Sequence, residues 1–143
     1  MLPNRLRAGD AIGVISPSHI ADPARYQRMF EGLQSLGFRV LPGRNLFLNT
    51  YGYAATERER ADDFNAMIAD PDVRLVLFGG GEGGNELLPY IDFEAVVRNP
   101  KLVLSYSDGT TILNAVHALT GLITFYGQTP GLFDNLSHYD FLQ

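Results

Sequence analysis

Cysteine is absent from this chain of 143 residues, and lysine occurs only at Lys101. Without cysteine there can be no disulfide bond, no catalytic thiolate and no zinc site built on sulfur. The absence of cysteine does not by itself indicate the cellular compartment. Acidic and basic residues are interspersed, the net charge is −5, and no run of lysine and arginine occurs. The sequence therefore lacks the electrostatic footprint of a nucleic-acid-binding protein, and we expect no nucleic-acid partner.

Long apolar runs are absent too. No segment approaches the roughly 20 apolar residues that cross a membrane, and the N-terminus has no apolar signal-peptide core. We therefore expect a cytoplasmic protein without a membrane partner. Apolar residues make up 45% and charged residues 19% of the chain, which is the balance of an ordinary globular domain. A single domain of this size can bury about 70% of the surface of its unfolded chain.

Short apolar segments alternate with amphipathic ones along the chain. Strands are predicted at residues 11–15, 38–41, 73–78, 101–104 and 122–126. Helices are predicted at residues 23–36 and 56–69, with shorter helical turns at 86–89 and 93–98. A last helix follows the fourth strand directly, with Ile112, Leu113, Val116 and Leu119 on one face, and ends near residues 120–121. This order predicts an α/β fold with an open, doubly wound, mainly parallel sheet, arranged as a flavodoxin-like three-layer sandwich.

The sequence of the second predicted helix indicates where the helix begins and which face is buried. Thr56 and Glu59 have the spacing of a capping box, which predicts the start of the helix. Ala61, Phe64 and Ile68 share its inward face, and we expect its glutamate and arginine side chains to face water. We expect the aromatic loop at residues 45–53 to lie over the edge of the sheet.

A sharp turn is predicted between the fourth strand and the last helix. It contains Ser105-Tyr-Ser-Asp-Gly109, which is similar to the Gly-x-Ser-x-Gly nucleophile elbow with serine in place of the first glycine. Such a turn exposes the Ser107 hydroxyl above the sheet. A strand-to-helix turn of this composition is more often only a helix cap, and we expect the Asp108 side chain to cap the following helix.

The glycine-rich run at residues 79–84 follows the third strand. Its spacing matches a dinucleotide-binding loop, but that motif belongs after the first strand and needs an acidic residue after the second. Alternatively, Gly80 and Gly81 offer backbone N–H groups that stabilise an oxyanion, or the run is a flexible loop that needs positive φ angles. Because carboxyl ends of parallel strands share one edge, residues 16–19, 79–84 and 105–109 are expected to meet there.

No convincing base accompanies Ser107, although a serine nucleophile needs one. His117 lies ten residues along the last helix, roughly 15 Å away at 1.5 Å per residue. His138 lies in a tail without a clear pattern. His19, on a loop at the carboxyl edge, is geometrically possible, but a histidine there more often contacts solvent or substrate.

Four segments together are similar to the N-terminal domain of the LD-carboxypeptidases, a family of serine peptidases that trim murein peptides. They are residues 6–18, 53–71, 79–89 and 100–110, of which Ser105-Tyr-Ser-Asp-Gly-Thr110 is the most specific. The resemblance implies that Ser107 is the nucleophile and that the backbone N–H of Asp108 forms the oxyanion hole with that of Gly80 or Gly81. Ser18, Glu82 and Tyr106 are expected to bind substrate. No metal or cofactor is implied.

The family's catalytic glutamate and histidine lie in a C-terminal domain that has no counterpart in this sequence. We therefore expect residues 1–131 to be the nucleophile-bearing domain, and residues 132–143 to be a tail or the start of a linker. This chain alone should be inactive or nearly so. We expect exposed apolar surface, in the tail in particular, and self-association as a homodimer.

The resemblance implies hydrolysis of an amide bond to a terminal D-amino acid in a small murein-type peptide. Ser105, Gly79 and the segment Tyr126-Gly-Gln128 depart from the common pattern and look like a divergent branch. The microcin-immunity peptidases, which cleave peptidyl-nucleotides, are such relatives. A non-catalytic flavodoxin-like binding or interaction domain remains an alternative. An amidohydrolase or amidotransferase of similar architecture is less favoured, because it usually has cysteine at the elbow.

Overall fold

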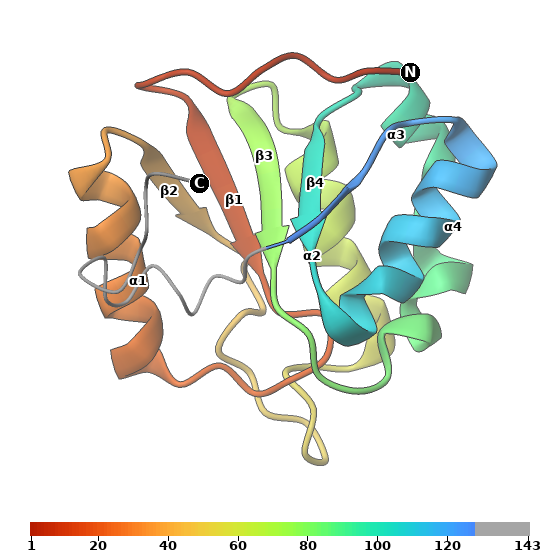
Figure 1. Cartoon of the computed structure of the whole chain (residues 1–143). Coiled ribbons are helices and arrows are strands. Elements are labelled where there is room, and N and C mark those ends of the chain that lie inside the picture. Colours follow the sequence, from red (N-terminus) through yellow and green to blue (C-terminus); the bar gives the residue numbers. More distant parts are fainter. Residues whose placement is uncertain (128–143) are drawn as a thin grey trace.

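The computed structural model describes residues 1–127 and contains one parallel sheet of five strands in the order β2-β1-β3-β4-β5 (Figure 1). The strands are β1 (Ala11–Ile15), β2 (Arg39–Pro42), β3 (Val73–Phe78), β4 (Leu102–Ser105) and β5 (Phe125–Tyr126). This strand order is that of flavodoxin-like sheets. The predicted α/β fold is therefore confirmed, whereas the expectations for His138 and for residues 132–143 lie outside the described residues.

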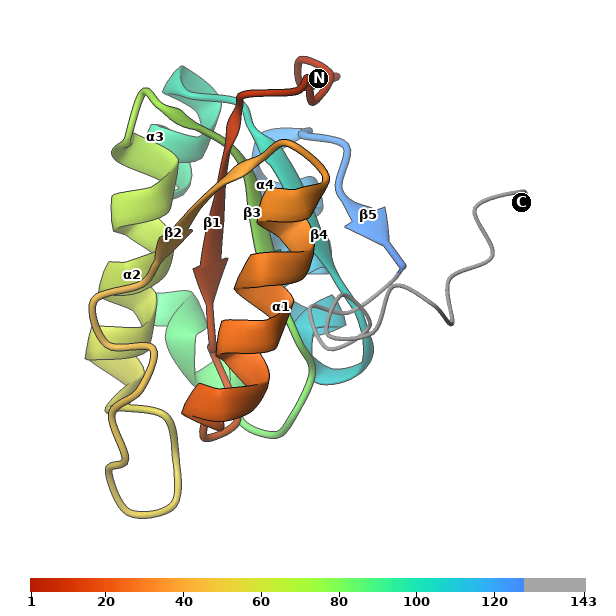
Figure 2. The same cartoon turned by 90° about the vertical axis from the view of Figure 1, so that its left-hand side faces the viewer.

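Helices cover both faces of the sheet. They are α1 (Pro23–Ser35), α2 (Glu57–Ala69), α3 (Phe93–Arg98) and α4 (Thr110–Thr120), with the short 3₁₀ helices η1 (Gly84–Tyr90) and η2 (Ser107–Gly109). Side chains of α1 pack with Ile12, Val14 and Leu77 on one face. Side chains of α2, α3 and α4 pack with Val76 and Val103 on the other. The result is three layers, which Figure 2 shows nearly edge-on.

The start of α2 follows from its capping box. The Thr56 hydroxyl accepts a hydrogen bond from the Glu59 N–H, and the Glu59 carboxylate accepts one from the Thr56 N–H, as predicted. Ala61 and Phe64 are buried. The expectation that every arginine of this helix faces water is wrong, because Arg60 is only 2% exposed. Its aliphatic stem and its paired head allow it to lie inside.

The last strand is shorter than predicted, because residues 122–124 bond elsewhere. The backbone N–H of Ile123 donates to the Met1 carbonyl at 2.8 Å, and the Thr124 hydroxyl donates to the Leu113 carbonyl at 3.2 Å. Leu122 is fully buried in the core under α4. The apolar run therefore identified a packed segment correctly, but only Phe125 and Tyr126 pair with β4.

The two ends of the sheet, where the strands begin and where they finish, differ. The N-terminal segment crosses the edge at which the strands begin (Figure 1, upper side), and it is fastened by hydrogen bonds from Met1 to Gly121 and from Gly9 to Gly37. The polar loops lie at the opposite, carboxyl edge. The loop at residues 45–53 also reaches this edge, where Leu46 is buried and Tyr51 is 98% exposed. The sheet therefore holds the predicted site residues at one end.

Candidate active site

The backbone at Ser107 has the geometry of a strained elbow. Between β4 and η2 the chain turns sharply, and Ser107 has a φ angle of 53°. A residue with a side chain seldom adopts this left-handed conformation, and strain of this kind gathers at functional sites. The Ser107 side chain is exposed, and η2 and α4 follow directly. A strand, a strained serine and a helix N-terminus therefore occur in the order that a nucleophile elbow requires.

Ser105 fits beneath this turn. Its side chain is fully buried, and its hydroxyl donates to the Gly79 carbonyl at 3.3 Å. A Cβ atom at Gly109 would collide with the Ser105 hydroxyl and would lie 2.9 Å from Ser105 Cβ and 3.0 Å from Phe78 Cε2. Serine at position 105 is therefore accommodated because position 109 has no side chain.

Asp108 does not cap the helix as expected. Neither η2 nor α4 has a side-chain cap at its N-terminus. Instead the Asp108 carboxylate accepts a hydrogen bond from the Gly84 N–H at 2.8 Å. The carboxylate is bonded to a distant donor rather than to the N–H groups of its own helix, because the end of the glycine run lies beside the elbow. Asp108 thus connects two of the three loops that were predicted to meet.

The glycine run packs directly on the serine. A Cβ atom at Gly80 would lie 2.7 Å from Ser107 Cβ and 3.3 Å from Ser107 Oγ, so only glycine permits this approach. Within residues 1–127, no acceptor takes a hydrogen bond from the backbone N–H of Gly80, Gly81 or Asp108. Gly80 is buried, and an unpaired backbone N–H is rare at a buried position. Beside a serine hydroxyl, such N–H groups are the donors that an oxyanion hole needs.

His19 is bound within the structure rather than facing solvent. Its Nδ1 lies 2.9 Å from the Gly80 carbonyl oxygen, and its Nε2 lies 3.1 Å from the Tyr26 hydroxyl. A carbonyl can only accept, so Nδ1 carries the proton, and in the neutral ring Nε2 accepts from Tyr26. Burial lowers the pKa of His19, against the opposing effect of the Gly80 hydrogen bond, and burial raises the pKa of Tyr26 to about 12.

This contact fixes the peptide between Gly80 and Gly81. In a trans peptide the C=O and the following N–H point in opposite directions. Because His19 holds the Gly80 carbonyl, the Gly81 N–H is turned away from His19. With Nδ1 donating and Nε2 accepting, His19 has no nitrogen left for the Ser107 proton. His117 is exposed, and its Nδ1 contacts the Leu122 carbonyl at 2.9 Å. It lies in the last turn of α4, roughly 15 Å along the helix from Ser107, and is therefore out of reach.

The three expected substrate-binding residues lie in different settings. Glu82 and Tyr106 are exposed, and Tyr106 adjoins the nucleophile. Ser18 is only 3% exposed, and its hydroxyl is the one buried side-chain polar atom without a partner within residues 1–127. Its Cβ would lie 2.7 Å from a Cβ at Gly81, where φ is 150°. The structure brings Ser18 to the glycine run, and substrate binding by these residues stays a prediction.

Arg60 is a buried residue beside the predicted site, and the sequence pattern had assigned it to the surface. Its guanidinium donates to the carbonyls of Pro17, Ala55 and Gly83, and pairs with Glu86 at 2.7 Å. The guanidinium carbon also lies 5.0 Å from the centre of the Tyr53 ring. Arg60 therefore connects the loops after β1, β2 and β3. The position of this arginine in the segment 53–71, which carries part of the resemblance, was the available signal.

Other kinds of site receive little support from the part of the chain that is described. In residues 1–127 there is no group of three or more histidine, cysteine or acidic residues that could hold a metal ion. No helix in the same range is long and apolar enough to span a bilayer. An open pocket of about 540 Å³ lies beside the glycine run, where Tyr53, Arg60 and Glu86 contribute to its lining.

Comparison with protein families identifies the domain. The model of the LD-carboxypeptidase N-terminal domain matches residues 12–127, which is most of the chain. A Vibrio cholerae protein named as a carboxypeptidase is 42% identical over 94% of this chain and 41% of its own length. The microcin C7 self-immunity protein MccF of Escherichia coli is 38% identical over 94% of this chain and 40% of its own.

Solved structures agree with these matches. That of MccF superposes with a TM-score of 0.90 at 36% identity, over 94% of this chain and 42% of that one. That of muramoyltetrapeptide carboxypeptidase from Oxalobacter formigenes gives a TM-score of 0.80 at 26% identity, over 90% and 44% respectively. The chain thus spans about two fifths of the length of the proteins it matches.

Proposed function

Because this chain belongs to the LD-carboxypeptidase family, we propose that it is the nucleophile-bearing part of a serine peptidase that hydrolyses an amide bond to a terminal D-amino acid in murein-type peptides. The observation that carries the proposal is Ser107, held at a φ of 53° beside unpaired backbone N–H groups. Such a site can attack a carbonyl and stabilise the charge that develops on its oxygen.

The reaction begins with attack of Ser107 Oγ on the carbonyl carbon of the scissile amide. The carbonyl oxygen becomes an oxyanion and accepts hydrogen bonds from Asp108 N–H and from Gly80 or Gly81 N–H. Donors aimed in advance at this charge each contribute roughly 10²–10³ in rate. Collapse of the intermediate breaks the C–N bond and releases the D-amino acid as its amine. Water then hydrolyses the acyl-serine in a second attack.

A base must take the serine proton and return it to the leaving amine. Both ring nitrogens of His19 are engaged elsewhere, and His117 lies at the far end of α4 from Ser107. We therefore assign the base to a histidine, oriented by a glutamate, in a C-terminal region like that of the longer family members. On this account the 143 residues alone turn over substrate slowly or not at all. Ser18, Glu82 and Tyr106 would contact the peptide.

A peptidyl-nucleotide substrate is the second candidate. MccF superposes on this chain more closely than the muramoyltetrapeptide carboxypeptidase does, with TM-scores of 0.90 and 0.80. MccF has been solved with aspartyl sulfamoyl adenosine and with glutamyl sulfamoyl guanosine. This closer likeness favours an acyl-nucleotide amide as a substrate to be tested beside the murein peptide.

The experiment joins this chain to the C-terminal region of a longer relative and measures both activities. An LD-tetrapeptide and a peptidyl-nucleotide amide are supplied separately, and released amine is quantified. Ser107→Ala should reduce cleavage of the preferred substrate at least about 10³-fold, as for other nucleophiles that act with a base. Ser35→Ala, at the exposed end of α1, serves as the matched control. Full activity of the Ser107 variant would overturn the proposal.

A further inference from the structure

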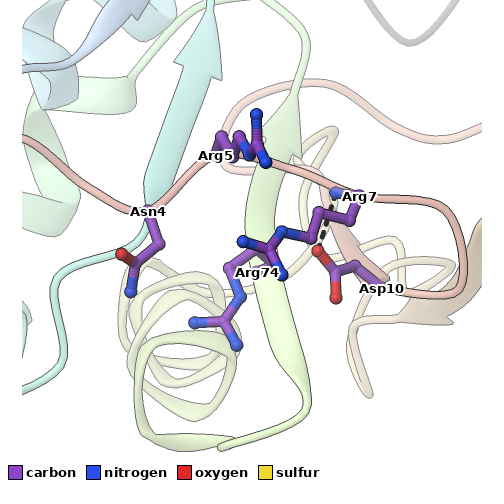
Figure 3. A pocket seen from close by; sticks show the side chains of 5 residues that line it. All are labelled: Asn4, Arg5, Arg7, Asp10 and Arg74. Atoms are coloured by element: carbon purple, nitrogen blue, oxygen red, sulfur yellow. Dashed lines mark hydrogen bonds between the residues drawn. The ribbon is translucent and has the colours of Figure 1, made fainter.

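A second concave site lies at the opposite end of the sheet. A pocket of about 290 Å³ opens where the strands begin, between the N-terminal segment and β3. Asn4, Arg5, Arg7, Asp10 and Arg74 line it. Figure 3 shows the side chains of Arg7 and Arg74 extending into this space. Ser107 and its loops are at the carboxyl edge, so this pocket is separate from the candidate active site.

The charge in this pocket is unbalanced. Within residues 1–127, the guanidinium groups of Arg5, Arg7 and Arg74 make no hydrogen bond or ion pair. The one carboxylate in the lining is Asp10, and it accepts the backbone N–H of Arg7 at 2.8 Å. Three positive groups and one negative group give the lining a charge of +2, in a chain whose net charge is −5.

The positive character extends beneath the pocket. Lys101 is buried, and its ammonium group donates to the carbonyls of Asp70 and Val73. Burial lowers the pKa of Lys101, repulsion from Arg74 lowers it further, and attraction to Asp70 opposes both. Like charges that are brought together without partners destabilise the folded chain unless an anion joins them. A bound anion would relieve this repulsion, which makes anion binding favourable here.

The fold, not the sequence, makes this cluster. Arg5 and Arg7 belong to the N-terminal segment, whereas Arg74 is the second residue of β3. Hydrogen bonds from Met1 to Gly121 and from Gly9 to Gly37 hold the segment across the strand ends. The backbone positions that carry the three arginines are thus brought around one pocket before any ligand binds, so that binding orders only the side chains.

We propose that this pocket binds a phosphate group of a small phosphorylated ligand. A phosphate monoester carries a charge of about −1.5 to −2 at neutral pH, which matches the lining better than a single carboxylate does. Guanidinium groups bind phosphate oxygens through paired, charge-assisted hydrogen bonds. The Asn4 amide adds a neutral donor. The volume of the pocket leaves room for part of the group that carries the phosphate.

The test is a calorimetric titration of the 143-residue chain at constant ionic strength. Inorganic phosphate, inorganic pyrophosphate and glucose 6-phosphate are compared, so that free phosphate and a phosphorylated small molecule are distinguished. We expect saturable binding with one site per chain. Arg7→Ala and Arg74→Ala should each weaken binding about tenfold or more, because each removes charge-assisted hydrogen bonds. Arg74→Lys keeps the charge but not the paired geometry, and should have an intermediate affinity.

Two matched variants separate a built site from general charge. Arg98→Ala removes the same charge from an exposed side chain that pairs with Asp92 and Glu94, and it should change affinity less than twofold. Asp10→Asn keeps an oxygen for the Arg7 N–H but removes the negative charge, and should tighten binding several-fold. Equal weakening by Arg98→Ala and Arg74→Ala, or no saturable binding of any probe, would overturn the proposal. Circular dichroism establishes that each variant is folded.

The phosphate site and the peptidase proposal can fail separately. Ser107→Ala should leave phosphate affinity unchanged, because Ser107 lies at the other edge of the sheet. A loss of phosphate binding in the Ser107 variant would contradict two separate sites. Loss of peptidase activity without loss of phosphate binding is the expected pattern.

Discussion

The Asp108 carboxylate accepts a hydrogen bond from the Gly84 N–H at 2.8 Å, and this contact joins the elbow to the far end of the glycine run. Gly80, at the near end of the run, packs against Ser107. The serine and the proposed oxyanion donors are therefore connected at two points. The spacing between them is set by a side chain as well as by backbone packing.

Asp108→Ala should impair catalysis more than binding. Loss of the acceptor leaves the glycine run free to move away from Ser107, and a displacement of about 1 Å can cost roughly 10²-fold in rate. We expect kcat of the chain joined to a C-terminal region to fall by about this factor, with a smaller change in KM. Asp108→Asn keeps an oxygen acceptor and should retain most activity. Steady-state kinetics on both substrates provide the measurement.

Asp62→Ala is the control for that series. This substitution removes the same charge as Asp108→Ala, but from an exposed position on α2. If Asp108→Ala raised KM alone, or if Asp108→Asn were as poor as Asp108→Ala, the positioning role would be wrong.

Stability should fall in mild acid because of His19. Burial lowers the pKa of His19 below its usual 6.5, so the folded chain binds its proton less readily than the unfolded chain. The unfolding free energy is therefore greatest above pH 6.5 and decreases as the pH falls from there toward the folded pKa. His19→Asn keeps an N–H donor for the Gly80 carbonyl but cannot titrate in this range.

Urea unfolding between pH 5 and 7.5 measures this effect. The His19→Asn variant should lose part of the dependence on pH that the wild-type chain has. An identical pH dependence for wild type and His19→Asn would show that His19 titrates alike in both states.

Ser105 and Gly109 should be energetically coupled. A methyl group at position 109 meets the Ser105 side chain and Phe78, so Gly109→Ala should cost about 1–3 kcal/mol through overpacking. In a Ser105→Gly background part of that contact is gone, and the same substitution should cost less. A double-mutant cycle by urea unfolding measures the difference. Gly127→Ala is the control, because its nearest contact is 3.5 Å away; strict additivity at 105 and 109 would refute the coupling.

Arg60 should matter more than its ion-pair partner. Arg60→Met leaves the carbonyls of Pro17, Ala55 and Gly83 without their donor, and unsatisfied buried polar groups cost about 1–3 kcal/mol each. We expect a loss of about 3 kcal/mol in unfolding free energy, near the lower end of that sum. Glu86→Gln should cost less than about 1 kcal/mol, because the Glu86 side chain is 42% exposed. Thermal and urea unfolding measure both; equal losses would contradict the loop-fastening role.

Local signals predicted the secondary structure well. The apolar segments at residues 11–15 and 73–78 are strands with the predicted bounds, and Phe93–Arg98 is a helix as predicted. The capping box located the start of α2 because its two hydrogen bonds lie within one turn. The order of the elements then predicted the sheet, since parallel strands with helical crossovers have few arrangements.

Long-range partners explain where the sequence misled. Asp108 is of a residue type that often caps helices, but its carboxylate binds the N–H of Gly84, 24 positions away in the sequence, instead of an N–H of its own helix. Arginine is usually a surface residue, but three loop carbonyls and the Glu86 carboxylate surround Arg60. The sequence has no basic run, yet folding brings Arg74 beside Arg5 and Arg7. None of these contacts follows from periodicity, because each depends on how distant segments meet.

The most direct test of the central claim is covalent trapping of the nucleophile. The chain joined to a C-terminal region is treated with a fluorophosphonate probe, digested and analysed by mass spectrometry. We expect one adduct, on Ser107, that is lost when the protein is unfolded and when excess substrate is present. Labelling of another residue, or of none in folded protein that cleaves substrate, would contradict the assignment of Ser107 as the nucleophile.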